Sequence, residues 1–229
     1  MMTLRDFSYP KGNPSLLSAD KNHLQEEVNK AALAGAYFIH IDVMDGLFVE
    51  NVSFGLKTAM DIVHPSISHP FLKDTHLMVN RPLDVVSDYA QCSDIVTFHI
   101  EATRSGEEIM KGASLIHNNH CFAGLAINPE TELENIFPYL KYFDLILLMT
   151  VHPGKGGQPF DPFGLTRIGR LKNELNKMEN PPILEIDGGV NEKTASGAIK
   201  AGAELLVAGS YLYGHSDFKE RFATLEKKI

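Results

Sequence analysis

The sequence predicts an α/β protein built as one (β/α)8 barrel, the TIM-barrel architecture. Eight short apolar runs recur at fairly even spacing along the 229 residues, and each has the length of a β-strand. Polar stretches with apolar residues at helical spacing separate these runs, which indicates parallel strands joined by right-handed helical crossovers. Because no G-x-G-x-x-G follows the first run, we favour the closed barrel over an open doubly wound sheet.

Several of the expected strands are rich in Ile, Val and Leu on both faces, as in a parallel sheet that helices cover. In chain order the strands are residues 14–19, 37–43, 75–79, 94–100, 121–127, 144–151, 182–187 and 204–210. We expect all eight in a single domain spanning residues 1–229, in which residues 1–13 are an N-terminal extension.

Three segments between the strands carry clear helix signals. Residues 19–36 and 162–179 have apolar residues at helical spacing, and the first of them reaches a glycine that suits a C-cap. Residues 191–204 begin with Asn191, a candidate N-cap, and end near Gly202.

Composition and charge limit the kinds of partner that the chain can have. With 44% hydrophobic and 22% charged residues, it has the composition of a soluble globular protein. A formal net charge of −8 without a basic run argues against nucleic-acid binding, and no apolar run is long enough to span a bilayer. We expect Cys92 and Cys121 to be buried thiols, and, since no apolar signal segment opens the chain, we expect a cytoplasmic protein.

Titratable residues gather where several of the expected strands end. His40 and Asp42 are two residues apart and therefore share a strand face, His76 has the corresponding place on the next strand, and Asp187 ends the seventh. Active sites of such barrels lie at the C-terminal ends of the strands, so these four side chains could bind one divalent cation. Imidazole and carboxylate ligands suit zinc, manganese or iron. The alternative is a buried histidine satisfied by a neighbouring aspartate, and the convergence of four such residues favours the metal.

Methionines and glycines lie near the same strand ends. Met44, Met78 and Met149 either fill the core or form an apolar floor beneath a ligand, and the sequence leaves both readings open. Glycine clusters within residues 152–160, 187–189 and 208–210 follow three successive strands; each alone could be a tight turn. Together they predict a phosphate cradle, because glycine lets backbone N–H groups approach an anion closely.

Seven segments resemble the ribulose-phosphate 3-epimerase family and run in the family's order from residue 14 to residue 214. They are "PSLLSAD", "HIDVMDG", "HLMV", "HIEA", "LLMTVHPGKGGQPF", "EIDGGVN" and "LVAGSYLYG". The resemblance implies a barrel of the ribulose-phosphate-binding type with one divalent metal ion per subunit, commonly zinc, with iron or manganese as alternatives. It also implies a homo-oligomer, a dimer or a hexamer, that acts in the pentose phosphate pathway.

The resemblance further implies a reaction and roles for individual residues. The family interconverts D-ribulose 5-phosphate and D-xylulose 5-phosphate through a metal-stabilised enediolate. Carried over, His40, Asp42, His76 and Asp187 are the metal ligands. Asp42 and Asp187 are also the acid/base pair, one on each face of the ketose phosphate. The implied substrate contacts are Ser15, Met44, His76, Met78, Met149, Gly154, Lys155, Gly156, Gly157, Gly188, Gly189, Gly209 and Ser210.

Three positions depart from the family's usual pattern and leave the substrate open. The loop after the sixth strand usually reads Asn- or Asp-Pro-Gly-Phe-Gly-Gly, whereas here His152 and Lys155 replace the first residue and the phenylalanine. Glu50 stands where proline is usual. A ketohexose phosphate such as allulose 6-phosphate is therefore the alternative substrate, and the pocket beside Lys155 and Glu50 would discriminate.

Two other functions are weaker alternatives. Decarboxylation or aldol chemistry on a related barrel would be expected to need a lysine near the reacting centre, and no inward-facing lysine is evident at a strand end. A sugar-phosphate sensor without catalysis would not need paired proton carriers, so the two aspartates argue against it.

Overall fold

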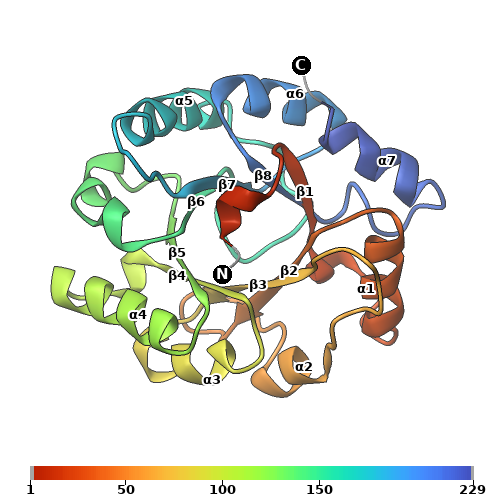
Figure 1. Ribbon diagram of the computed structural model, residues 1–229, viewed down its shortest axis with the longest axis horizontal. Coiled ribbons are helices and arrows are strands. Elements are labelled where there is room, and N and C mark those ends of the chain that lie inside the picture. Colours follow the sequence, from red (N-terminus) through yellow and green to blue (C-terminus); the bar gives the residue numbers. More distant parts are fainter. Residues whose placement is uncertain (1–2, 228–229) are drawn as a thin grey trace.

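Eight parallel strands form a barrel that helices surround, in a computed structural model that describes residues 3–227 (Figure 1). The strands are hydrogen-bonded in the order β1-β8-β7-β6-β5-β4-β3-β2. An isolated parallel bridge between Ser15 and His40 joins the two remaining edges, so the barrel is nearly closed. The predicted fold class is confirmed.

The strands alternate with helices, and the connection between β5 and β6 contains 3-10 helices in place of an α-helix. The strands are β1 (Lys11–Pro14), β2 (Phe38–Met44), β3 (Leu72–Met78), β4 (Ile95–His99), β5 (Phe122–Ile127), β6 (Leu145–Met149), β7 (Ile183–Asp187) and β8 (Leu205–Ala208). The helices are α1 (Leu24–Leu33), α2 (Leu56–Asp61), α3 (Val86–Ala90), α4 (Gly106–Asn118), α5 (Gly164–Leu175), α6 (Glu192–Ala201) and α7 (Phe218–Leu225). Short 3-10 helices are η1 (Leu4–Asp6), η2 (Leu16–Ser18), η3 (Pro82–Asp84), η4 (Ile100–Ala102), η5 (Leu133–Asn135) and η6 (Phe137–Tyr142).

The first strand is the element that the sequence misplaced. It was expected within residues 14–19, but β1 ends at Pro14 and the apolar residues after it form η2. The cause is Ser15, whose hydroxyl accepts a hydrogen bond from the backbone N–H of Leu17 and thereby starts a 3-10 turn. The strand therefore begins inside residues 1–13.

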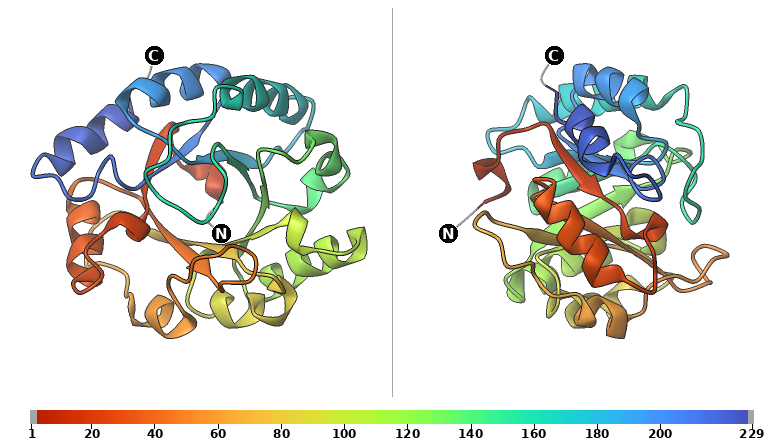
Figure 2. Two further views of the ribbon diagram at one scale, coloured as in Figure 1. Left: turned by 180° about the vertical axis from the view of Figure 1, so that it is seen from behind. Right: turned by 90° about the vertical axis from the view of Figure 1, so that its right-hand side faces the viewer.

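The N-terminal residues close one end of the barrel. In Figure 1 the red η1 lies in the middle of the ring of strands. Leu4 belongs to the same buried cluster as the interior residues Phe38, Leu72 and Ile95. The other end is left for the loops that follow the strands, and Figure 2 (left) shows the loop after β6, in teal, crossing this mouth.

The helix ends agree with the signals in the sequence. The Asn191 side chain accepts hydrogen bonds from the backbone N–H groups of Lys193 and Thr194 at the start of α6, and Gly202 ends the helix with φ 114°. Helices α1 and α5 lie within the two ranges expected for them. No helix in the described part of the chain is long and apolar enough to cross a membrane.

Alternation along the strands divides the core into two parts. All seven residues of β2 are buried; Ile39, Ile41 and Val43 belong to the large apolar cluster that includes the helices. The alternate residues face the barrel interior, where Phe38 is apolar and His40 and Asp42 are polar. The same change from apolar to polar along the interior brings the titratable residues together at one end. Cys92 and Cys121 are free thiols, half-buried and buried.

Candidate metal centre and active site

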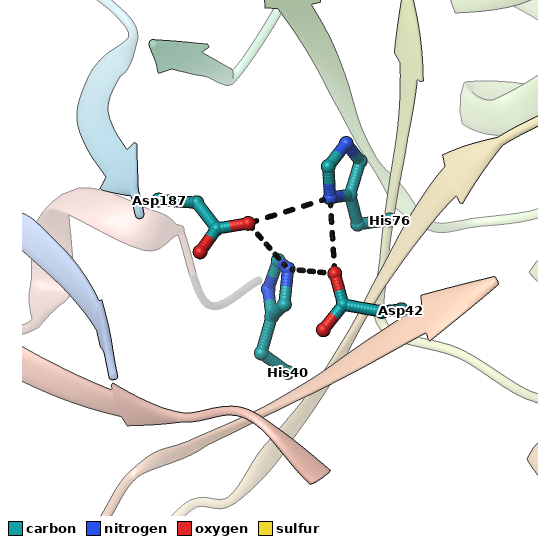
Figure 3. A group of neighbouring side chains, drawn as sticks. All are labelled: His40, Asp42, His76 and Asp187. Carbon is teal, nitrogen blue, oxygen red and sulfur yellow. Dashed lines mark ion pairs between the residues drawn. The ribbon is translucent and has the colours of Figure 1, made fainter. Parts of the chain in front are cut away.

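Four side chains from three strands converge at the C-terminal end of the barrel interior. His40 and Asp42 come from β2, His76 from β3 and Asp187 from β7, as Figure 3 shows. Asp42 Oδ1 lies 3.4 Å from both His40 Nε2 and His76 Nδ1, and Asp187 Oδ2 lies 3.9 Å from the same two nitrogens. The four potential ligand atoms all lie within 4.8 Å of one another.

The atoms of this cluster fit a divalent cation. His40 Nε2 and His76 Nδ1 are buried and have no hydrogen-bond partner among the described residues. Unpaired buried polar atoms are costly, and a cation between the nitrogens and the carboxylates would satisfy all of them at once. Two imidazole nitrogens and two carboxylate oxygens form a donor set that suits zinc, iron or manganese. The buried group could therefore hold a metal ion.

The two aspartates differ in their electrostatic surroundings. Burial and the nearby charge of Asp42 raise the pKa of Asp187 to about 7. Burial acts in the same direction on Asp42, but the nearby imidazoles of His40 and His76 outweigh it and hold the pKa of Asp42 below its usual range. Two carboxyl groups whose pKa values are pushed apart are typical of an acid/base pair.

A second layer of buried polar side chains, which the sequence analysis did not predict, lies nearer the N-terminal ends of the strands and contacts His40. Asp74 Oδ2 accepts a hydrogen bond from His40 Nδ1 at 2.6 Å. The Asn13 amide donates to Asp74 at 2.7 Å and to Glu185 at 2.8 Å, and all of these side chains are fully buried. The signal was available, because Asp74 precedes His76 by two residues and Glu185 precedes Asp187 by two, so each shares an inward face.

A different chain of contacts leads away from His76. Its Nε2 lies 2.8 Å from Nε2 of His99, at the end of β4, and His99 Nδ1 lies 3.1 Å from Glu101 Oε2. Burial lowers the pKa of His99 to about 4. In the sequence both residues lie in the stretch "HIEA", whose pattern alone indicates no role for either of them.

A cavity of about 500 Å³ lies against the cluster. Asp42 and Asp187 line it, and so do all the residues that the resemblance implied as substrate contacts except His76, which is fully buried. Met44, Met78 and Met149 are among them, so the cavity has an apolar side beside the two carboxylates. Ser15 donates a hydrogen bond to Asp42 Oδ2 at 2.7 Å and thus orients this carboxylate.

Glycines from three successive strand ends line the same cavity. Gly189 has φ 65°, and a Cβ at this position would lie 2.3 Å from the backbone nitrogen of Phe160, so no side chain fits. Gly157 also has a positive φ, and Gly209 lies close to Ser18. Arg221 of α7 lines the cavity as well, and the sequence offered no signal for it because only the fold brings α7 to this end.

The three departures from the family pattern share a second cavity of about 450 Å³. Glu50, His152 and Lys155 all line it, and Lys155 lines the first cavity too. His152 Nδ1 lies 3.0 Å from a carboxylate oxygen of Glu130. The loop that carries His152 and Lys155 therefore separates two hollows at the barrel mouth.

Comparisons with known proteins agree with this geometry. Residues 11–213 match the ribulose-phosphate 3 epimerase family. Ribulose-phosphate 3-epimerase of Bacillus subtilis (strain 168) is 39% identical over 214 residues, which cover 93% of this chain and 96% of that protein. The protein of the same name from Escherichia coli (strain K12) is 38% identical over 209 residues, covering 90% of each. The chloroplastic ribulose-5-phosphate-3-epimerase of Arabidopsis thaliana is 38% identical over 209 residues, covering 91% of this chain and 73% of that one.

Solved structures share the fold at low sequence identity. A tryptophan synthase complex from Pyrococcus furiosus aligns with TM-score 0.66 and 16% identity over 96% of this chain and 98% of that one. Thiamine phosphate pyrophosphorylase from Pyrococcus furiosus aligns with TM-score 0.63 and 17% identity over 94% and 93% of the two chains. These likenesses show the barrel and nothing about the reaction.

Proposed function

The chain belongs to the ribulose-phosphate 3-epimerase family, and on that premise we propose that it interconverts D-ribulose 5-phosphate and D-xylulose 5-phosphate by inverting carbon 3. The observation that carries the proposal is the cluster of His40, Asp42, His76 and Asp187 beside a cavity with glycines from three strand ends.

Epimerisation needs one group that removes the proton at carbon 3 and another that returns a proton from the opposite face. Asp42 and Asp187 enter the cavity from different strands, β2 and β7. Asp42 is held by Ser15, whereas the Asp187 side chain is 18% exposed and faces the cavity. Two carboxylates that enter from different strands can divide these two proton transfers between them.

We propose that His40, Asp42, His76 and Asp187 hold one divalent cation, with zinc first and iron or manganese as alternatives. When bound, such a cation would supply positive charge beside the substrate oxygens on which negative charge develops after the proton leaves. The buried Asp42 carboxylate and the unpaired ring nitrogens of His40 and His76 support this assignment.

The other end of the substrate is a phosphate. We propose that the backbone at Gly157, Gly189 and Gly209, together with Ser210, binds it, and the position of all four residues in the lining of the first cavity supports this role. The guanidinium of Arg221 adds positive charge to the same cavity, although it also pairs with Asp217 at 2.8 Å.

We further propose a cytoplasmic homo-oligomer, a dimer or a hexamer. The resemblance to the family is the basis of this proposal, since the most exposed large apolar side chains of the described residues, such as Leu33, Leu47 and Phe163, lie on separate segments. Light scattering on the purified protein measures the assembly size, and a monomer would refute this part of the proposal.

The experiment that tests the reaction is proton NMR of the protein with D-ribulose 5-phosphate in D₂O, with and without a chelator. We expect deuterium to enter at carbon 3 while xylulose 5-phosphate appears, and we expect the chelator to abolish both. No exchange in metal-replete protein would refute the epimerase assignment.

A ketohexose phosphate is the second candidate substrate. It is favoured by the cavity that Glu50, His152 and Lys155 line next to the first one, because these residues replace the usual proline, Asn or Asp, and phenylalanine. The same experiment with allulose 6-phosphate decides between the two, since exchange with the hexulose alone would keep the mechanism and change the substrate.

A further inference from the structure

The path from His76 to Glu101 is a continuous series of hydrogen-bonding atoms. His76 Nε2 and His99 Nε2 lie 2.8 Å apart, and His99 Nδ1 lies 3.1 Å from Glu101 Oε2. The second carboxylate oxygen, Oε1, accepts from the backbone N–H of Asn128 at 2.8 Å and from the hydroxyl of Thr131 at 2.5 Å. Both histidines are fully buried, and the Glu101 side chain is 21% exposed.

The rings in this path are buried and meet edge to edge. His99 and His76 have ring centroids 4.9 Å apart and planes 27° apart, with their Nε2 atoms facing each other. Phe48 lies against His99, with a centroid distance of 4.7 Å. Because neither ring has room to turn freely, the hydrogen-bonding order along the path depends on which nitrogens carry protons.

The Glu101 carboxylate determines which nitrogen donates and which accepts in each of these hydrogen bonds. An ionised carboxylate only accepts, so His99 Nδ1, facing Glu101, must carry a proton. In a neutral ring the other nitrogen then accepts, so His99 Nε2 takes a hydrogen bond from His76 Nε2–H. With its proton on Nε2, His76 presents an unprotonated Nδ1 to Asp42 and Asp187, which is the form that a metal ion requires.

We propose that Glu101 is a positioning residue for the metal cluster, acting through His99 to keep the proton of His76 on Nε2 and its Nδ1 free. The inference rests on the proposed metal site. In this arrangement His76 is linked to the Glu101 carboxylate through His99, whereas His40 contacts the Asp74 carboxylate directly.

Replacing Glu101 by glutamine tests this role directly, because the amide would reverse the donor and acceptor of each hydrogen bond along the path. The glutamine oxygen would keep the place that accepts from Asn128 N–H, since a backbone N–H can only donate. Its NH₂ group would then face His99 Nδ1 and require a lone pair there. His99 would donate from Nε2, and His76 would carry its proton on Nδ1, toward the cluster.

The readouts are zinc affinity, measured by competition with a coloured chelator, and the protonation of ring nitrogens, measured by ¹⁵N NMR of histidine-labelled full-length protein with and without zinc. For the original chain we expect protons on His76 Nε2 and His99 Nδ1 even after zinc is removed. For Glu101→Gln we expect the reversed order and zinc binding that is weaker by about 10–100-fold.

Asp144→Asn is the matched control. Asp144 also faces a histidine, with 2.8 Å between its Oδ2 and His117 Nε2, but this pair lies outside the barrel. We expect zinc affinity within about twofold of the original, a change much smaller than a lost second-layer partner gives.

Three outcomes would overturn the inference. If the zinc-free original chain carries the His76 proton on Nδ1, the carboxylate does not set the order, and this result needs no variant to fold. If Glu101→Gln binds zinc as tightly as the original, only the inference fails. If the original chain itself binds no zinc, iron or manganese, the proposed metal site fails and the inference fails with it.

Discussion

The ligand cluster and the loop over it differ in how firmly the fold holds them. His40, Asp42 and His76 are at most 2% exposed, and side chains from other segments of the barrel contact their polar atoms. The loop of residues 152–158 is largely exposed and is held by Gln158, which donates to two carbonyl oxygens within it, and by Asn51, which donates to the carbonyl oxygen of Gly154. The difference supports the proposal that the reacting groups lie on strands, whereas the residues proposed to select the substrate lie in an exposed loop.

Removing a proton carrier from the cluster should have the largest effect. We expect Asp187→Asn to lower the rate of C3 inversion by about 1,000-fold, within the range that a lost general acid or base gives. The assay is conversion of ribulose 5-phosphate followed by NMR, with the metal content of the variant measured alongside. Outside the cluster, in the segment between β2 and α2, the same carboxylate-to-amide change at the exposed Glu50 should stay within about threefold of the original rate, since it removes no proton carrier.

The assignment of Asp42 and Asp187 as two proton carriers predicts a second result for Asp187→Asn. With Asp42 still present, one epimer should continue to exchange its C3 proton with D₂O faster than it is converted to the other. Equal loss of exchange from both epimers, in a variant that keeps its metal, would show that the aspartates do not act on separate faces.

Metal removal should also lower stability, in addition to the loss of the reaction that is expected with the chelator. A ligand at 100 times its dissociation constant stabilises a folded protein by about 2.7 kcal/mol, which corresponds to about 5–10 °C in Tm for a chain of this size. We expect the chelator to lower Tm by this amount in the original chain and in loop variants such as Lys155→Gln. His76→Gln should show little response, and a full response in that variant would contradict the ligand set.

The sequence predicted the cluster well because strand geometry alone decides which residues share a face. His40 with Asp42 follows from spacing by two, and the barrel fold then places His76 and Asp187 at the same end. The same spacing by two along a strand also predicts that Asp74 and Glu185 face the barrel interior. Glu101 is different, since its contact with His99 depends on side-chain torsions in a turn after β4, which no periodicity encodes.

The misplaced first strand has a similar local cause. Leu16 and Leu17 look like strand residues by composition, but the Ser15 hydroxyl gives their backbone another hydrogen-bonding partner. The arrangement of the loop after β6 was equally beyond prediction, because the contacts of Gln158 and Asn51 with carbonyl oxygens follow from the folded chain.

Substitution of Gly189, which follows β7 just beyond the cluster residue Asp187, should give a smaller effect. Gly189→Ala places a Cβ 2.3 Å from the backbone nitrogen of Phe160, so the segment after β6 must shift. Gly35→Ala is the control, because Gly35 also has a positive φ of 101° but no atom within 4 Å of the added carbon. Both should lose about 1 kcal/mol from the left-handed backbone conformation. Gly189→Ala alone should also raise KM for the sugar phosphate, and an unchanged KM would remove Gly189 from the proposed phosphate site.

The smallest effect on the reaction is expected at Lys155, where Lys155→Phe restores the residue usual in the family. Lys155 is exposed and lines both cavities, so a phenylalanine would replace a charge with an apolar surface without touching the ligand cluster. We expect kcat/KM for ribulose 5-phosphate to change by less than about tenfold, a difference of about 1.4 kcal/mol, with zinc affinity unchanged. The ratio of pentulose to hexulose turnover should rise, because the added ring narrows the space beside Glu50.

Lys155→Gln separates the effect of charge from the effect of shape, since it removes the charge but adds no ring. If it shifts the ratio equally, charge and not shape selects the substrate. A loss of more than about 100-fold in C3 exchange on both sugars would correspond to more than about 2.7 kcal/mol of transition-state stabilisation. That result would mean that the loop takes part in the reaction, and the division between cluster and loop would be wrong.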